Sequence, residues 1–508
     1  MKKPLCLLTI LFIPVAALAQ NSTTGIFRNS QDIGNPKNKG AAVYNEADQS
    51  YQLKGSGYNI WFGRDEFYYL WNPIKGDFLL TASFRFEGNG TEPHRKTGWM
   101  IRTSTDDNSP HISAALHGDG LTLLQWRDYK GAEMKDPEDQ IFARDSGYFV
   151  IQLERTGNVI FMRAAKEGSP FEEIGSYEML NLPNEILAGL FICSHNPDII
   201  ETVKIRNVRI DKPVPANYNA TRDGAVGCRL ETMNVFDGTR KVIWEKDGRF
   251  EAPNWMPDGK KLLFNMDGLM YTFPVTGGEP EVLNTGSVNR NNNDHGISFN
   301  GKLLALSGQQ QGVQGGSNVF IVSLKGGEPR KITDEAPSYW HGWAPNNKEV
   351  VYVAQRGGKK VYNIYRNSIK GGKEVALTDI PAGEHVDGCE YSPDGKYIYY
   401  NGSHTGNMQL WRIKPDGSGR EQLTFDEYKN WFPHISPDGK WIAFISFPPD
   451  IEKNSHPSYK RVMLRLMPAT GGEPKVIAYL YGGQGTINVP SWSPDSKQIA
   501  FVSNSGIK

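Results

Sequence analysis

The chain has 508 residues, with 56 basic and 56 acidic side chains, so its formal charge is zero. A neutral chain lacks the global basic field on which nucleic-acid binding depends, and the composition therefore predicts no nucleic-acid partner. Aromatic residues make up 11% of the chain, which is enough to bury a sizeable core and excludes a disordered protein. Glycine and proline, at 54 and 31 residues, favour short strands and tight turns over long helices.

Residues 1–19 predict a signal peptide that is cleaved from the mature chain. Lys2 and Lys3 give a basic start, and the apolar stretch over 5–15 that follows is too short to span a bilayer. The small-x-small sequence at 17–19 is typical of a cleavage site. Because no later segment has 18 apolar residues in a row, we expect no membrane span and a periplasmic or extracellular location.

Residues 20–212 predict an all-β domain, because strand-like runs alternate with turns rich in Gly, Asp and Asn. Such a series is typical of a two-sheet sandwich. The runs lie at 78–86, 99–102, 111–116, 121–126, 148–154, 159–163, 187–193 and 203–210. Their order, and the sequence over 189–195 that leads into the last run, resemble the concanavalin-A-like jelly-roll domains of secreted bacterial proteins. The resemblance implies a jelly-roll sandwich, and the following residues 213–227 are predicted to be a linker.

A six-residue unit recurs six times in the second half of the chain. Its clearest form is Trp255-Met256-Pro257-Asp258-Gly259-Lys260, and an apolar strand follows each copy. The copies lie at 255–260, 297–302, 343–348, 391–396, 435–440 and 492–497. Their spacing of 42 to 57 residues matches a four-stranded propeller blade, and Pro-Asp-Gly is a strong turn former. The repeat therefore predicts a six-bladed β-propeller.

The ends of this repeat array predict how the propeller closes. The sequence stops just after the second strand of the sixth unit. Residues 228–247 contain two further strand-like runs, joined by a turn at Asp237-Gly238, that supply the missing strands. We therefore expect the propeller to span 228–508, with 228–247 closing its last blade. The whole chain is predicted to be all-β, a jelly-roll sandwich followed by a six-bladed propeller.

The tandem Trp-x-Pro-Asp-Gly-Lys units resemble the TolB-type propeller repeat. Together with the leader and the sandwich, they make the chain look like TolB-related exported proteins of bacteria. The resemblance implies a protein of the cell envelope. It leaves the function open, because propellers serve as binding modules and as enzymes alike.

Polar side chains gather where the first strand of each predicted blade begins. Residues at these positions ring the mouth of a propeller's central channel, and the His residues of this half all map to that face. Neutral imidazoles from different blades suit a divalent metal, and neighbouring carboxylates can complete the site or orient the rings. An imidazole beside a carboxylate or a metal also acts as a general base. The candidate catalytic residues are His295, His341, Asp387, Glu390 and His434, with His295, His341 and His434 as candidate ligands of Mn, Ca or Zn.

Aromatic rings and polar groups at the same mouth predict contacts with a substrate. Flat rings stack on sugars, and the candidate substrate-binding residues are Tyr339, Trp340, His385, Trp431 and Asn488. An alternative stays open for each of them, because His at such positions also bonds the neighbouring blade and aromatic residues also pack between blades. Side chains alternate along a strand, so adjacent positions cannot both face the channel. Either His295 and His341 point inward, or Glu390 and His434 do, unless the loops that enter these strands twist.

The scaffold and the predicted His ligands also resemble, in part, the oligogalacturonate lyases. That resemblance implies a divalent metal at the channel mouth and a His base for β-elimination. The present sequence differs from that family in two respects. It has six predicted blades where the family has seven, and nothing in it matches the family's Gln ligand or its base.

The sandwich gives two weaker signals. Trp61, Trp71, Trp99 and Trp126 predict either a glycan-binding face or core packing. The sequence Asp106-Asp107-Asn108 predicts either a Ca²⁺ site or a solvated loop.

Three functions are consistent with these observations. The first is an exported binding protein of the bacterial envelope that contacts a glycan or an envelope protein. The second is a carbohydrate-active enzyme, a lyase or a glycosidase, with a His and carboxylate site at the channel mouth. The third is a TolB-like component of an envelope transport complex. The sequence favours the first by a narrow margin over the second, and it favours the third least, because a sandwich stands where TolB proteins have a different N-terminal domain.

Overall fold

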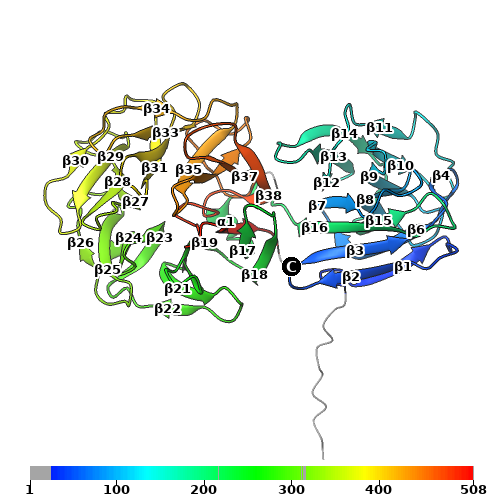
Figure 1. The fold of residues 1–508 in the computed structure, drawn as a ribbon, viewed down its shortest axis with the longest axis horizontal. Helices are drawn as coiled ribbons and strands as arrows, with labels where there is room; N and C mark the ends of the chain where they lie inside the picture. The colour runs from blue at the N-terminus through cyan, green and yellow to red at the C-terminus, as the bar shows by residue number, and fades with distance from the viewer. Residues whose placement is uncertain (1–23, 216, 311, 313–315, 507–508) are drawn as a thin grey trace, which may run out of the picture.

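The computed structural model describes residues 24–215, 217–310, 312 and 316–506. The predicted signal peptide over 1–19 lies outside the described residues. The described chain forms two all-β units that lie side by side (Figure 1). Strands β1–β16 build the N-terminal unit and β17–β39 the C-terminal unit, and the short helix α1 (Ala220–Asp223) lies between them in the sequence. In this described part of the chain, no helix has the length and apolar character needed to cross a membrane.

Within the described residues, the N-terminal unit has two seven-stranded antiparallel sheets and a small hairpin, β4 (Ile60–Trp61) and β5 (Arg64–Asp65). The first sheet has the order β1 (Asn29–Ile33), β6 (Phe67–Lys75), β15 (Glu185–Cys193), β8 (Lys96–Arg102), β9 (His111–His117), β10 (Thr122–Arg127) and β11 (Gln140–Phe142). The second has the order β14 (Glu172–Glu178), β13 (Val159–Ala165), β12 (Val150–Thr156), β7 (Phe78–Phe86), β16 (Glu201–Asp211), β3 (Ser50–Gly55) and β2 (Ala41–Asn45).

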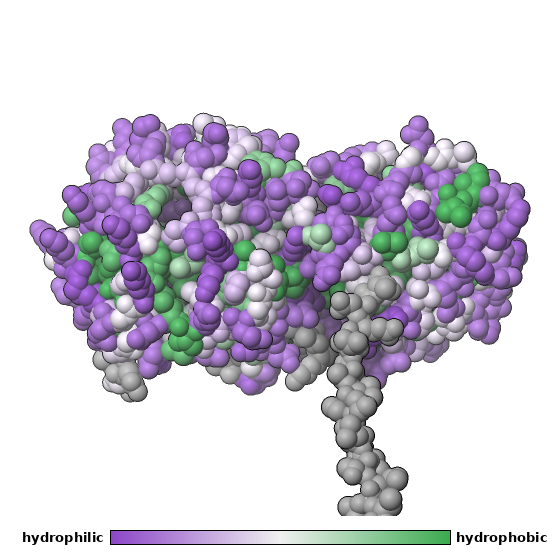
Figure 2. Space-filling view, turned by 60° about the horizontal axis from the view of Figure 1, so that its bottom comes forward, coloured by the Kyte–Doolittle hydropathy of each residue, from purple (hydrophilic) through white to green (hydrophobic). Residues whose placement is uncertain are grey.

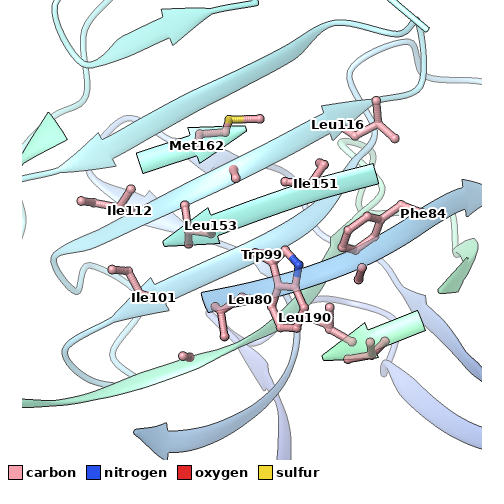
Figure 3. Close-up of a cluster of buried hydrophobic side chains, with 14 of the residues drawn as sticks. Leu80, Phe84, Trp99, Ile101, Ile112, Leu116, Ile151, Leu153, Met162 and Leu190 are labelled. Atoms are coloured by element: carbon pink, nitrogen blue, oxygen red, sulfur yellow. The ribbon is translucent and has the colours of Figure 1, made fainter. Parts of the chain in front are cut away.

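The two sheets share one hydrophobic core, because alternate side chains of a strand point to the same face. Leu80 and Phe84 of β7 meet Trp99 and Ile101 of β8 in this core (Figure 3). The N-terminal unit is therefore a two-sheet sandwich. Its resemblance to concanavalin-A-like jelly rolls stays a prediction.

This core corrects the expectation of a glycan-binding face for two of the four tryptophans. Trp99 is fully buried, and Trp126 is buried with its ring stacked on Tyr177 at a centroid distance of 3.9 Å. Both indoles therefore pack in the core. Trp61 and Trp71 are half-buried, and a glycan contact there stays a prediction.

The C-terminal unit is a six-bladed β-propeller in the described chain, seen on the left of Figure 1. Blade one is β19 (Phe250–Trp255), β20 (Lys261–Met266), β21 (Leu269–Pro274) and β22 (Glu281–Leu283). Blade two is β23 (Val288–Ile297), β24 (Leu303–Gln310), β25 (Asn318–Ser323) and β26 (Arg330–Lys331). Blade three is β27 (Ser338–Trp343), β28 (Glu349–Ala354), β29 (Asn363–Ser368) and β30 (Val375–Ala376). Blade four is β31 (Val386–Tyr391), β32 (Ile398–Gly402), β33 (Gln409–Ile413) and β34 (Glu421–Gln422). Blade five is β35 (Lys429–Ile435), β36 (Trp441–Phe447), β37 (Lys460–Pro468) and β38 (Lys475–Gly482).

The sixth blade joins the two ends of the propeller segment. β17 (Cys228–Asn234) pairs along its whole length with β39 (Gln498–Asn504) and on its other edge with β18 (Arg240–Lys246). A bridge between Trp492 and Ile499 adds the start of this blade. Because strands from both ends hydrogen-bond in one sheet, the ring cannot open without breaking the pairing of β17 with β39.

The recurring Ser-Pro-Asp-Gly-Lys sequence forms the turn between the first two strands of a blade. In blade four, the Ser392 hydroxyl donates to Asp394 Oδ1 over 2.7 Å, and the Lys396 amide donates to the same oxygen over 3.1 Å. Gly395 has a φ of 70°, which glycine adopts without steric cost. The motif is therefore a local turn that joins the first and second strands of a blade into a hairpin.

The sandwich and the propeller are in contact through a buried charged cluster. Glu231 of β17 accepts hydrogen bonds of 2.6 Å from both Arg209 of β16 and Arg240 of β18. Nearby, the Gln49 side-chain amide exchanges two hydrogen bonds of 2.9 Å with the backbone of Val242. The last strand of the sandwich therefore braces the blade on which ring closure depends.

Candidate functional site

A polar cavity of about 400 Å³ lies at the centre of the propeller. All six blades or the segments that lead into them contribute to its wall, mainly where their first strands begin. The lining residues are Arg249, Glu251, Asn292, Asn293, Asp294, Tyr339, His341, Val353, Tyr362, His385, Asp387, Phe432, Asn454, His456, Gln484 and Asn488. Because amide, imidazole, carboxylate and phenol groups dominate this lining, the cavity suits a polar ligand.

Three imidazoles surround Asp387 in this cavity. His341 Nε2 lies 2.7 Å from Asp387 Oδ1, within hydrogen-bonding distance. His385 Nε2 and His456 Nε2 lie 3.7 Å and 3.9 Å from Asp387 Oδ2. The three His residues belong to blades three, four and five, so the packing of three consecutive blades brings them to one carboxylate.

The proton affinities of these groups are strongly perturbed. Burial by itself raises the pKa of Asp387, but the His341 and His385 imidazoles outweigh burial and hold that pKa well below its ordinary value of 3.8. Burial likewise opposes the charged form of His341, yet the Asp387 carboxylate raises the pKa of His341 above its ordinary 6.5. The pair therefore favours the carboxylate–imidazolium form.

Asp294 is a second carboxyl group in the same cavity, and its environment acts in the opposite direction. Burial raises the pKa of Asp294 to about 7, and the nearby Asp387 carboxylate adds to this effect. Asp294 therefore holds a proton at mildly acidic pH while Asp387 is ionised. Two carboxyl groups of different protonation thus share one cavity, which is the arrangement that acid–base chemistry requires.

Irregular strand pairing explains which side chains reach the cavity. The register of the first strand slips in each of blades one to five. In blade four the slip falls between Asp387 and Glu390, and Gly388 has a φ of 59° there. A Cβ on Gly388 would lie 2.7 Å from Asn401 Oδ1, so conformation and space both require glycine. Asp387, on one side of this β-bulge, lines the cavity, whereas Glu390, on its other side, does not.

Half of the residues that the sequence selected line the cavity. They are Tyr339, His341, His385, Asp387 and Asn488. Their position agrees with the expectation that the starts of the first strands surround the channel. Their predicted catalytic and substrate-binding roles stay predictions.

Trp340 and Trp431 do not offer the stacking faces that we expected. Both side chains have an exposed fraction of 0%. Trp340 packs over Gly296, where an added Cβ would lie 2.0 Å from the indole. Trp431 packs behind the cavity, with its ring centroid 4.4 Å from that of His456 and 5.7 Å from that of His385. The expectation is therefore corrected: these two indoles belong to the core, and Trp431 supports the imidazoles from behind.

His434 and Glu390 form a clamp between blades and do not line the cavity. His434 Nδ1 lies 2.7 Å from Glu390 Oε2, and His434 Nε2 lies 2.7 Å from the carbonyl oxygen of Ile487. His295 is fully buried, and burial lowers its pKa to about 4, so its ring is neutral. Of the three predicted metal ligands, His341 alone lines the cavity, which corrects the expected grouping of His295, His341 and His434.

Among the residues that the structure describes, no set of three or more His, Cys, Asp or Glu side chains is posed to hold a metal ion. The imidazole nitrogens around Asp387 are nevertheless of the kind that binds a divalent metal. Nδ1 of His341, Nε2 of His385 and Nδ1 of His456 are buried without a hydrogen-bond partner. A divalent metal at the channel mouth therefore stays a prediction. So does Ca²⁺ at Asp106, where the carboxylate lies 2.6 Å from Lys130 Nζ.

Asp294, Asn454 and His456 are three of the lining residues that were not selected from the sequence. Asp294 lies beside a bulge that alternation cannot anticipate. Asn454 and His456 belong to the loop over 448–459 between β36 and β37, and its unusual length was the available signal. The Asn454 side-chain amide donates to the Gly383 carbonyl over 3.2 Å, which ties this loop of blade five to blade four.

The six blades and the central polar cavity define a propeller of the TolB type. No family model matches the chain. Over 281 residues the chain is 42% identical to the uncharacterised protein Atu1656 of Agrobacterium fabrum, a match that covers 55% of this chain and 93% of the relative. The chain therefore belongs to the family of Atu1656.

Two further comparisons agree with this assignment. A solved structure of a TolB-type protein from Agrobacterium tumefaciens has 41% sequence identity and a TM-score of 0.52, covering 55% of this chain and 99% of that one. The Tol-Pal system protein TolB of Francisella tularensis is 25% identical over 273 residues, or 52% of this chain. The chain covers 59% of the length of that TolB protein.

Proposed function

We propose that the chain is a binding protein of the bacterial envelope and that its ligand occupies the propeller cavity. The observation that carries the proposal is the cluster around Asp387, where imidazoles from three blades face one carboxylate. His385 and His456 keep 19% and 25% of their side chains exposed, so a ligand can reach them. Ionisable groups perturbed in this way gather at functional sites more often than elsewhere.

Carbohydrate is the ligand class that the lining favours. The lining carries both hydrogen-bond acceptors and donors, as sugar hydroxyls require. Arg249 and Glu251 form an ion pair at the rim, so the lining carries charges of both signs and suits a neutral polar ligand. Tyr339 and Tyr362 are half-buried, with ring centroids 6.0 Å apart, and supply the flat surfaces that the buried tryptophans do not.

A TolB-like component of an envelope complex is the second candidate, and the relatives fit it better than they fit a glycan-binding protein. In this case the ligand is a segment of an envelope protein. On the face drawn in Figure 2 the surface is largely hydrophilic, with small apolar patches over both units. A polar peptide segment that enters the cavity suits such a surface better than a partner that docks on a broad apolar area.

A carbohydrate-active enzyme, a lyase or a glycosidase, is the third candidate. It is supported by the pairing of a protonated Asp294 with an ionised Asp387 beside His341. In this case Asp294 is the general acid and the Asp387–His341 pair is the base or the stabilising charge. A divalent metal bound by His341, His385 and His456 would add Lewis-acid chemistry to this set.

The N-terminal regions complete the proposal. The signal peptide over 1–19 directs the chain to the periplasm or the exterior, and Gln20 is then the first residue of the mature protein. N-terminal sequencing of the exported protein tests this expectation. We also propose that the sandwich is a concanavalin-A-like jelly roll, on the basis of its two seven-stranded antiparallel sheets.

Binding measurements with one matched pair of variants test the central proposal. The purified chain is screened against neutral and acidic oligosaccharides and against peptides from envelope proteins, and affinities are measured by calorimetry. Asp387→Asn removes the charge that orients three imidazoles, and we expect at least tenfold weaker binding. Asp394→Asn makes the same chemical change in an exposed turn and leaves binding unchanged. Equal affinity of Asp387→Asn and the unmodified protein for every ligand that binds would place the site elsewhere.

The same screen separates the three candidates. Binding of oligosaccharide without product supports the glycan-binding protein, and binding of peptides alone supports the TolB-like component. Unsaturated or new reducing ends in the sugar mixture, detected by chromatography, support the enzyme. Elemental analysis of the purified protein tests the metal, with His341→Ala as the variant that loses it.

A further inference from the structure

A second group of histidines lies on the sandwich, apart from the propeller cavity. His94 lies in the loop between β7 and β8, His117 ends β9, and His195 follows β15. The ring centroid of His94 lies 5.7 Å from that of His117 and 5.5 Å from that of His195. Glu92 Oε1 lies 3.5 Å from His195 Nδ1. Three separate segments thus bring three imidazoles and one carboxylate to one rim of the sandwich.

His117 is the member of this group that most clearly lacks a partner. Its side chain is buried, with an exposed fraction of 6%, and neither ring nitrogen has a hydrogen-bond partner. Buried polar atoms in proteins are nearly always satisfied, so two orphaned nitrogens on one ring require an explanation. A free imidazole nitrogen is a common ligand of metal ions.

The spacing of two pairs of rings, His94 with His117 and His94 with His195, suits one shared ion. With zinc–nitrogen bonds of about 2.0–2.1 Å, two imidazoles on a tetrahedral ion have ring centroids roughly 5 Å apart. The two separations of 5.5 Å and 5.7 Å are close to this value. The side chains as described are not yet posed around one point, and the exposed His94 ring is the one that can turn to close the set.

The backbone at His195 gives a further indication of a built site. His195 has a φ of 58°, a left-handed conformation that is uncommon for a residue other than glycine. Such strained residues cluster where a side chain must be held for a ligand. Here the conformation holds the His195 ring between His94 and Glu92.

Lys96 lies two residues after His94, and its side chain is restrained. Its ammonium group is buried and donates to Asn59 Oδ1 over 2.9 Å. The Glu92 carboxylate supplies the opposite charge on the solvent side of the cluster.

We propose that Glu92, His94, His117 and His195 bind one divalent cation of the zinc class at the rim of the sandwich. A set of three imidazoles and one carboxylate selects borderline ions such as Zn²⁺ over Ca²⁺ or Mg²⁺. The ion clips the loop before β8 to the end of β9 and to the segment after β15. This site is independent of the propeller cavity and of the function proposed for it.

Metal titration of the full chain without its predicted signal peptide tests the site. The protein is treated with a chelator and titrated with Zn²⁺ by calorimetry, and Co²⁺ absorption reports tetrahedral coordination. His94→Ala changes an exposed side chain, and His195→Asn keeps a residue that tolerates the left-handed backbone, so both variants should fold. We expect each variant to bind Zn²⁺ at least tenfold more weakly and to lose the rise in Tm that Zn²⁺ gives the unmodified protein.

The matched control is Asp394→Asn in an exposed turn of the propeller, which should leave this Zn²⁺ affinity unchanged, and His341→Ala reports any Zn²⁺ that binds in the propeller cavity. Circular dichroism verifies that each variant is folded. Wild-type Zn²⁺ affinity in both sandwich variants would overturn the proposal, and so would a loss of Zn²⁺ binding in His341→Ala alone. Neither result would bear on ligand binding at Asp387, because that test uses a different variant and a different ligand.

Discussion

Replacing Glu231 by glutamine tests whether the buried charged cluster holds the sandwich and the closing blade together. Glu231 is fully buried and accepts from Arg209, Arg240 and the Ser503 hydroxyl, the last at 2.5 Å. Glutamine keeps the shape of the side chain but removes its charge, so two buried guanidinium groups lose their counter-ion. Breaking a buried ion pair in this way destabilises a protein by about 3–5 kcal/mol. If the propeller segment over 228–508 unfolds as one unit, that loss lowers Tm by roughly 5–9 °C.

Glu421→Gln is the matched control for this variant. Glu421 also forms a two-point ion pair, with Arg412 at 2.8 Å and 3.0 Å, but 52% of its side chain is exposed. Exposed pairs contribute about 0–1 kcal/mol, so the control should change Tm by about 2 °C or less. Differential scanning calorimetry measures both variants. A Tm of Glu231→Gln within 2 °C of the control would refute the reasoning.

The same cluster predicts a dependence of stability on acid. Burial by itself raises the pKa of Glu231, but Arg209 and Arg240 outweigh burial and lower it far below the ordinary 4.5. A carboxyl group with a lowered pKa in the folded state stabilises the protein fully above the unfolded value and loses this contribution as the pH falls below it. The Tm difference between Glu231→Gln and the unmodified protein should therefore be largest at neutral pH and shrink below about pH 4.5. A difference independent of pH would contradict the assignment of the charge to Glu231.

Three further predictions concern the propeller. His434→Phe leaves Glu390 and the Ile487 carbonyl without their buried partner, so urea denaturation should show that the free energy of unfolding falls by about 2–3 kcal/mol. An unchanged free energy of unfolding would show that these two contacts do not stabilise the propeller. Asp294→Asn should have a higher Tm than the unmodified protein at pH 8 and the same Tm at pH 4. The reason is that a carboxyl group whose folded-state pKa is raised to about 7 costs the protein stability as the pH rises through that value. A Tm difference that widens toward pH 4 would contradict this prediction. Gly296→Ala forces a Cβ to within 2.0 Å of Trp340 and should destabilise the protein by about 1–3 kcal/mol in the same assay, whereas Gly63→Ala, which has open space, should not; equal effects would show that the packing relaxes freely.

Much of the fold could be predicted because its information is local and repeated. The Pro-Asp-Gly turns depend on hydrogen bonds within a few residues, such as that of Ser392 with Asp394, and on the φ of one glycine. A unit that recurs at a regular spacing then indicates a ring of blades without any knowledge of long-range contacts. The repeat also predicts that the first strands of the blades begin around the central channel, and Tyr339, His341 and Asp387 line the cavity there.

The rest of the site was decided by tertiary structure. Strand geometry predicts strict alternation of side chains, and a slip of one residue reverses which side chain faces inward. A bulge at Gly388 separates Asp387, which lines the cavity, from Glu390, which pairs with His434. No pattern in a single strand reports such a slip, because it depends on how the neighbouring blade packs.

The sequence by itself determined the class of architecture, a TolB-like propeller of six blades. Only the tertiary structure decided which side chains share a space, because each cluster draws on segments that lie far apart in the chain. Asp387 meets His341 and His456 across three blades, and His94 meets His117 and His195 across three segments of the sandwich. Repeats and turns depend on neighbouring residues, whereas a site at the centre of the propeller forms only when separate blades pack around it.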